Sequence, residues 1–128
     1  MSFTDYLEQK ILEHTFRNTA YTSPTTVYVG LLSAAPTDST AGTELSGNGY
    51  ARQACAFDAF SGGKSVANTS AETFTASGGS WITITHFGVY DASTGGNLLV
   101  YGEIGPSVQV SDGESFIIDA GKLVIELS

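Results

Sequence analysis

The fold class is decided by one stretch, Trp81-Ile-Thr-Ile-Thr-His-Phe-Gly-Val-Tyr90. Isoleucine and threonine alternate over residues 82–85, and Phe87 and Val89 continue the β-prone run. A period of two sends successive side chains to opposite faces of a sheet, so that apolar residues face the core and hydroxyls face water. We therefore predict that residues 81–90 form the central strand.

Turn residues recur about every ten positions around this strand. A polar turn, Asp91-Ala-Ser-Thr-Gly-Gly-Asn97, follows it, and the pair Asp112-Gly113 predicts a tight hairpin. Nothing after Pro24 has the helical period of a βαβ crossover, so the pattern predicts an all-β fold, an antiparallel β-sandwich of jelly-roll-like or Ig-like type. The expected strands cover residues 27–32, 51–57, 66–74, 81–90, 98–104, 108–110, 116–118 and 122–127, with a polar loop over 33–49 and an interruption at Pro106.

The segment before Pro24 follows a different period. Phe3, Leu7 and Ile11 recur at every fourth position and form one apolar stripe. This spacing predicts one N-terminal amphipathic α-helix over about residues 3–17. Because no linker or repeat divides the chain, we expect a single domain, residues 1–128.

The ends and the surroundings of this helix can also be read from the sequence. Ser2 or Thr4 can cap its start, and Asn18 is expected to end it. Its apolar stripe, which Leu12 and Phe16 widen, either packs on the sandwich or docks on a neighbouring protein. The first is the commoner use of such a stripe, since an amphipathic helix normally faces its own core.

The charge balance is strongly acidic. Five Lys and Arg residues stand against 13 Asp and Glu residues, which gives a net charge of −8. The basic residues are scattered, so no stripe could neutralise phosphates, and we expect no nucleic-acid partner. No apolar run approaches the ~20 residues that cross a bilayer, and no signal peptide pattern opens the chain, so we expect no membrane partner.

Residues for chemistry are sparse. His14 and His86 are the only histidines, and neither belongs to a spaced metal-ligand pair. A nucleophile elbow of the form G-x-S-x-G is missing, and the single cysteine, Cys55, excludes a zinc site built from several thiolates. We therefore expect no enzyme activity, no catalytic residue, no cofactor and no metal, and a packed or hydrogen-bonded role for His86.

Two other features have competing readings. Asp91 begins a stretch that is similar to the start of a calcium loop, but Gly102 stands where the terminal glutamate is needed, so an Asx-type turn is favoured. The aromatic residues could form a sugar-stacking platform, but most fall inside the expected strands. The core is therefore the expected place of Phe57, Phe74, Phe87 and Phe116.

The chain resembles a group of short proteins from the structural modules of tailed phages, labelled tail-fibre, head-fibre or capsid decoration proteins. The resemblance spans nearly the whole chain, and its order of motifs is more specific than any one of them. The motifs are Phe3-Thr-Asp-Tyr-Leu-Glu-Gln-Lys-Ile-Leu12, Phe16-Arg-Asn-Thr-Ala-Tyr21, Pro24-Thr-Thr-Val-Tyr-Val-Gly-Leu31, Gly42-Thr-Glu-Leu-Ser46, Gly49-Tyr-Ala-Arg-Gln53, Phe87-Gly-Val-Tyr-Asp-Ala92, Gly95-Gly-Asn-Leu-Leu99 and Gly121-Lys-Leu-Val-Ile-Glu-Leu127.

The resemblance implies a virion protein that is made in the host cytoplasm and works by surface complementarity. The expected function is that of a capsid decoration, or cement, protein that binds the major capsid protein. The alternative is a tail-fibre or baseplate component for host attachment, with carbohydrate binding as one possible means. A homo-oligomer is expected, and a trimer would fit a quasi-threefold position on the shell.

The predicted contact surfaces are the N-terminal segment and the 33–49 loop. Aromatic and arginine residues are enriched at protein interfaces, which favours Tyr21, Tyr50 and Arg52 as anchors. Tyr50 and Arg52 could equally be residues that only open a strand. The predicted interface residues are Phe3, Leu7, Ile11, Tyr21, Tyr50 and Arg52.

Overall fold

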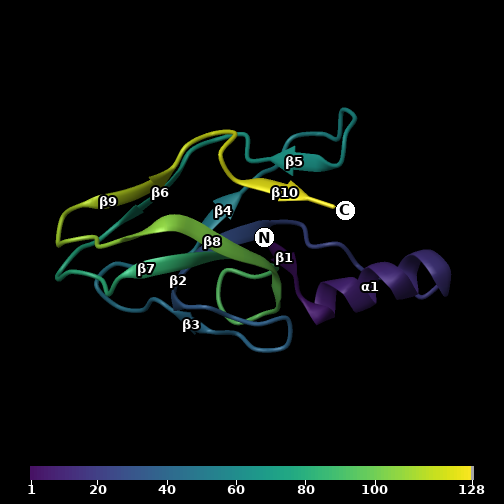
Figure 1. The fold of residues 1–128 in the computed structure, drawn as a ribbon, viewed down its shortest axis with the longest axis horizontal. Coiled ribbons are helices and arrows are strands. Elements are labelled where there is room, and N and C mark those ends of the chain that lie inside the picture. Colours follow the sequence, from purple (N-terminus) through teal and green to yellow (C-terminus); the bar gives the residue numbers. More distant parts are fainter. Residues whose placement is uncertain (128) are drawn as a thin grey trace.

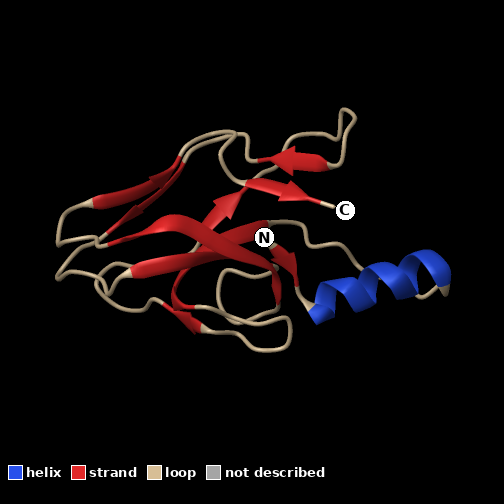
Figure 2. Cartoon of the chain, in the orientation of Figure 1, coloured by secondary structure: helices blue, strands red, loops and turns tan. Residues whose placement is uncertain are grey.

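The computed structural model describes residues 1–127 and shows an antiparallel, sandwich-like all-β fold with one short N-terminal helix (Figures 1 and 2). This confirms the predicted fold class. The elements are β1 (Ser2–Phe3), α1 (Asp5–Phe16), β2 (Val27–Ala34), β3 (Thr43–Glu44), β4 (Gln53–Cys55), β5 (Ser65–Ala67), β6 (Glu72–Thr75), β7 (Ile84–Tyr90), β8 (Leu98–Val108), β9 (Ser115–Ile118) and β10 (Val124–Glu126).

The larger layer is a six-stranded sheet in the order β1-β8-β7-β2-β3, with β4 also paired to β2. Two short antiparallel pairs, β10–β5 and β6–β9, lie across from it (Figure 1). At the centre, Val29 and Leu31 of β2 face Val89 and Phe87 of β7 across the strand pair, and all four belong to the core. The apolar residues that alternate along β2 and β7 therefore line the interior.

The four predicted core phenylalanines all contact this interior. Phe74 is 1% exposed and Phe87 is 9% exposed. Phe57 and Phe116 are half-buried and pack against the same cluster. The prediction of core positions for these aromatic residues is confirmed.

The strand predicted over residues 81–90 begins later than expected. Trp81 is buried and its amide donates to Val110, but Ile82 is 59% exposed and β7 starts only at Ile84. Ile82 and Ile84 have the same parity, so both would face the core if the strand covered them. The backbone before Ile84 therefore does not continue the strand, and the predicted start at Trp81 is wrong by three residues.

Pro106 does not end its strand. β8 runs from Leu98 to Val108, and its register against β7 shifts between the pairs His86–Glu103 and Ile84–Val108. A proline is tolerated in such an irregular stretch because it removes no regular ladder hydrogen bond there.

The turn at Asp112-Gly113 is present, but the pairing predicted around it is wrong. Gly113 has a positive φ of 83°, and the amide of Glu114 donates to Ser111. The strand after the turn, β9, pairs with β6 in the register Phe116–Phe74 rather than with residues 108–110. A turn motif indicates where the chain reverses, whereas the partner of a short strand depends on which edge has room for it.

Two short parts of the predicted 33–49 loop belong to the sheet. β2 continues to Ala34, and β3 pairs with it inside the expected loop. Leu45 is 4% exposed and belongs to the core cluster. Two parts of the segment, residues 37–43 and 46–49, are exposed throughout, so these parts are free for outside contacts.

Candidate attachment surface

The start of α1 is fixed to the sheet by one buried residue, Thr4. Its amide donates to Leu99, and its hydroxyl donates to the carbonyl oxygens of Leu98 at 2.7 Å and Leu99 at 3.1 Å. The same hydroxyl accepts the amide of Leu7, as an N-cap residue does. Of the two caps predicted from the sequence, Thr4 is the one used.

The prediction that the helix covers Phe3 is wrong. Ser2 and Phe3 form β1, which pairs with Tyr101 and Val100 of β8, and the helix begins at Asp5. Phe3 fits the four-residue spacing of the apolar residues, and its side chain lies near the apolar stripe of the helix although its backbone is not helical. The backbone is extended there because β8 offers a free edge to pair with.

The far end of α1 stops as predicted. Asn18 has a positive φ of 54°, and the amides of Arg17 and Thr19 both donate to the carbonyl of Glu13. Asparagine tolerates this left-handed conformation better than most residues, so it suits a helix C-terminus. The chain then turns back, and the amide of Tyr21 donates to Nδ1 of His14.

Beyond its first turn, α1 projects away from the sandwich (Figures 1 and 2). None of the residues Asp5–Phe16 is buried. Leu7 packs against the core, whereas Leu12 is 56% exposed and Phe16 is 76% exposed. Only the first part of the apolar stripe therefore packs on the sandwich, and the rest of the stripe is exposed.

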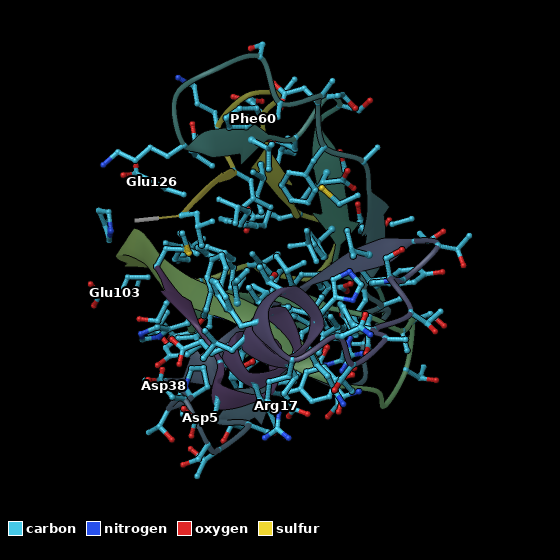
Figure 3. The ribbon with its side chains drawn as sticks, turned by 90° about the vertical axis from the view of Figure 1, so that its right-hand side faces the viewer. Asp5, Arg17, Asp38, Phe60, Glu103 and Glu126 are labelled. Carbon is cyan, nitrogen blue, oxygen red and sulfur yellow. The ribbon has the colours of Figure 1, made fainter. Side chains whose placement is uncertain are left out.

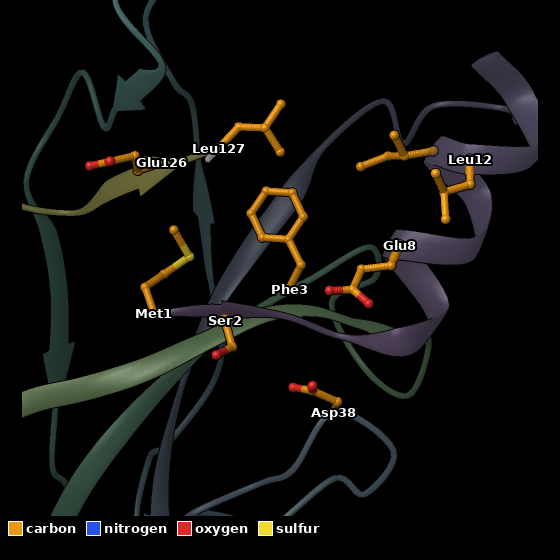
Figure 4. Close-up of a pocket in the computed structure, with 9 residues that line it drawn as sticks. Met1, Ser2, Phe3, Glu8, Leu12, Asp38, Glu126 and Leu127 are labelled. Carbon is orange, nitrogen blue, oxygen red and sulfur yellow. The ribbon is translucent and has the colours of Figure 1, made fainter. Parts of the chain in front are cut away.

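A groove lies between α1, β1 and the end of β10. It has a volume of about 410 Å³. Figure 4 shows the Phe3 ring between Leu127 on one side and Leu12 on the other. We call this the α1 groove, and the residues that line it are Met1, Ser2, Phe3, Glu8, Ile11, Leu12, Asp38, Glu126 and Leu127.

Acidic residues surround the same end of the molecule. Figure 3 looks onto this end and shows Asp5, Asp38, Glu103 and Glu126 around α1, with Phe60 on the loop before β5. Phe60 is 66% exposed. The end that carries the helix thus combines exposed apolar side chains with carboxylates.

A second cluster, on the outer face of the large sheet, is built quite differently. The Arg52 guanidinium binds both carboxylate oxygens of Glu44 at 2.8 Å and donates to the carbonyl oxygens of Ala92 and Gly95, also at 2.8 Å. It lies 3.5 Å from the centroid of the Tyr90 ring, in a cation–π contact. We call this set of contacts the Arg52 clasp; it joins β3, the start of β4 and the turn after β7.

Tyr50 belongs to the same cluster. Its hydroxyl donates to Glu44 at 2.5 Å and accepts the amide of Leu31 at 3.0 Å. Its ring lies edge-on to Trp81 and parallel to Phe74. The polar atoms of Tyr50 and Arg52 therefore make their hydrogen bonds within the protein.

The surroundings of the clasp favour the protonated forms of Tyr50, Tyr90 and Arg52. Burial raises the pKa of Tyr90 to about 12, and burial together with the hydrogen bond to Glu44 raises the pKa of Tyr50 well above its usual range. Burial alone would lower the pKa of Arg52, but the Glu44 carboxylate outweighs it and the pKa is raised. Arginine and both tyrosines therefore keep their protons at neutral pH.

The predicted interface residues thus fall into two places. Phe3 and Ile11 line the α1 groove, whereas Leu7 packs against the core and does not line the groove. Tyr21 lies beside the helix, where burial and the nearby Tyr6 raise its pKa. Tyr50 and Arg52 belong to the clasp. Their part in an interface stays a prediction.

The sequence reading missed the groove residues that come from outside the helix. Asp38 lies in the long loop, and Leu127 lies at the other end of the chain. No periodic signal links these positions to α1, because the tertiary fold alone brings them together. Met1 and Glu8 could have been found, since both flank the helical stripe in the sequence.

Other candidate residues have local roles. The Asp91 carboxylate accepts the amide of Asn97 at 2.7 Å and its side-chain amide at 2.9 Å, so it closes the turn after β7 across six residues. A bond of this span is not the Asx-type turn that the sequence predicted, which joins residues two positions apart. Nδ1 of His86 lies 2.8 Å from the hydroxyl of Thr85. Within residues 1–127, His, Cys, Asp and Glu form no group of three that could hold a metal ion. The helix in this part of the chain is too short to cross a membrane.

Comparisons with known proteins identify the family. The family described as podophage GP4 fiber I protein gp80 has a model that matches residues 2–126. A search of curated proteins finds no match. Since the match covers nearly the whole chain, this protein belongs to the podophage GP4 fiber I protein gp80 family and is a fibre-type structural component of a phage particle.

Proposed function

We propose that this protein is a non-enzymatic fibre subunit that attaches to the podophage particle through α1 and the α1 groove. The body of the sandwich then extends from the attachment point and presents its opposite end, which carries the turn between β8 and β9, to the surroundings (Figure 1).

The exposure of α1 is the observation that carries the proposal. A helix of 12 residues is marginal in isolation, and here only its first turn is held by the sheet. Leu12 and Phe16 remain exposed on the projecting part. Burying either side chain against a partner would contribute about 1.5–3 kcal/mol, so attachment would also stabilise the helix.

Fibre attachment is favoured over capsid decoration because the matching family is described as a fibre protein. The test is to separate purified particles into tails and tail-free heads and to assay each fraction for this chain. Recovery with tails is the expected result. Recovery with tail-free heads would favour the decoration function and contact with the major capsid protein, and absence from both fractions would refute a virion role.

The attachment surface is tested with particles that lack this subunit. The chain with Leu12→Ser and Phe16→Ser should lose binding to such particles, while the unmodified chain should bind. A matched control carries Ile82→Ser and Ile117→Ser, because these residues are 59% and 52% exposed but do not line the groove. Equal binding by both variants would place the attachment elsewhere.

The absence of enzyme activity is part of the same proposal. The polar atoms of Arg52, Glu44 and Tyr50 contact one another, and His86 contacts Thr85, so each is engaged within the fold. Assays with esters and host-surface glycans should show no turnover. Turnover that disappears in His86→Ala would contradict the proposal.

Self-association into a trimer remains a prediction. Sedimentation of the purified chain measures it directly, and a monomer at all concentrations would contradict it. A saturable affinity for host surface polysaccharide would add a receptor-binding role to the attachment role.

A further inference from the structure

The charges of the α1 groove restrict what can bind in it. Apolar atoms come from Met1, Phe3, Ile11, Leu12 and Leu127, and carboxylates come from Glu8, Asp38 and Glu126. Among the described residues, none that lines the groove is a lysine, an arginine or a histidine. The lining thus combines an apolar surface with three carboxylates, which outnumber the one ammonium group of the lining, the α-amino group of Met1.

The surroundings compensate these carboxylates only weakly. Glu126 lies 3.8 Å from Lys64, with both side chains more than half exposed, and such a pair is weak in water. Asp38 accepts a hydrogen bond from the Tyr101 hydroxyl at 2.6 Å, which leaves its charge in place. Lys10, the basic residue on α1 next in sequence to the groove residue Ile11, lies over the Tyr6 ring instead.

From this geometry we infer that the α1 groove receives a segment of another virion protein in which lysine or arginine residues flank apolar ones. The inference rests on the proposed attachment through α1 and specifies the chemistry of the partner. A purely apolar segment would remove the carboxylates from water without pairing them, which is costly. Basic residues beside the apolar ones would pair with them.

A second copy of this chain fits the groove poorly. In a twofold contact, the same three carboxylates of each copy would meet across the interface. The charge pattern therefore favours a different, basic partner.

The first experiment measures binding of the purified chain to particles that lack it, at increasing sodium chloride concentration. Glu8→Gln with Glu126→Gln removes two groove charges and should weaken binding about tenfold at low salt. It should also flatten the salt dependence, because fewer ion pairs remain to be screened. The control Asp112→Asn with Asp119→Asn removes the same charge outside the groove and should bind like the unmodified chain.

The second experiment uses a defined probe, an amphipathic peptide of leucine and lysine, and a matched peptide of leucine and glutamate. NMR should show the methyl signals of Met1, Leu12 and Leu127 shifting with the leucine–lysine peptide only. Unfolding curves of each variant establish that it is folded. Equal response to both peptides would overturn the inference.

The outcomes separate the two proposals. If Leu12→Ser with Phe16→Ser abolishes particle binding while the Glu8 and Glu126 substitutions and salt have no effect, attachment through α1 stands and the basic partner is refuted. If the unmodified chain fails to bind particles, the attachment proposal fails, and the basic partner fails with it. Sedimentation showing a dimer that Leu12→Ser dissociates would make a second copy the occupant.

Discussion

The Arg52 clasp and the projecting helix α1 place their side chains in opposite situations. In the clasp, a guanidinium, a carboxylate and a tyrosine hydroxyl satisfy one another, and the Arg52 side chain is only 8% exposed. On α1, apolar side chains such as Phe16 lie in water although they have no polar atom to satisfy. Residue type alone would suggest the reverse, with the charged cluster as the functional one.

The difference shows that a functional surface is recognised by side chains that have no partner within the protein, including apolar side chains exposed to water. A half-buried ion pair whose guanidinium already binds a carboxylate and two carbonyl oxygens has little left to offer a partner, and its main effect is to hold three segments in one arrangement. Exposed leucine and phenylalanine side chains in contact with water have a free energy to gain on burial. Four variants test this contrast.

The largest effect is expected from Arg52→Ala. Removing the guanidinium leaves Glu44 without its cation and the carbonyl oxygens of Ala92 and Gly95 without their donor. We expect a loss of about 3 kcal/mol in the free energy of unfolding, measured by urea denaturation. The control Arg52→Met with Glu44→Leu should lose much less, and a loss below about 1 kcal/mol for Arg52→Ala would mean that the clasp is dispensable.

A smaller loss is expected from Gly30→Ala. A Cβ atom at this position of β2 would lie 2.8 Å from the Tyr90 ring and 2.9 Å from both the Glu44 carboxylate and the Tyr50 hydroxyl. Relief of these contacts must displace the clasp, at about 1–3 kcal/mol in the same denaturation assay. Unchanged stability would show that the clasp can shift without cost.

Thr4→Val tests the joint between the helix and the sheet. The substitution keeps the shape of the side chain but removes the hydroxyl that bonds Leu98, Leu99 and the amide of Leu7. We expect a loss of about 1–2 kcal/mol and a weaker helical signal in circular dichroism. A full helical signal would indicate that the backbone hydrogen bonds of Thr4 and β1, together with Leu7, hold α1 in place without the hydroxyl.

The smallest effect on stability is expected from Leu12→Ser with Phe16→Ser. Both side chains are exposed, so each substitution should change the free energy of unfolding by no more than about 0.5 kcal/mol. A large loss would mean that α1 folds back onto its own sandwich in solution, and the contrast with the clasp would disappear.

Much of the fold could be predicted from the sequence because its signals are local. Alternation around Ile84–Tyr90 indicates a strand, the i, i+4 spacing from Leu7 to Ile11 indicates a helix, and Asn18 marks its end. Each of these depends on residues close together in the chain. The family resemblance added the virion role, which the residues alone do not indicate.

The tertiary structure determined which strands pair and which distant side chains contact one another. Alternation shows which side chains share a face but not which strand lies beside them, so the pairing of β9 with β6 could not be predicted. Arg52 binds residues 8, 40 and 43 positions away in the chain, and the α1 groove joins Met1 to Leu127. By itself the sequence determined that this protein has strands and a helix with an apolar stripe. Only the fold determined that the residues of the Arg52 clasp bind one another and that most of the apolar stripe of α1 remains exposed. Both outcomes depend on contacts between segments that are distant in the chain.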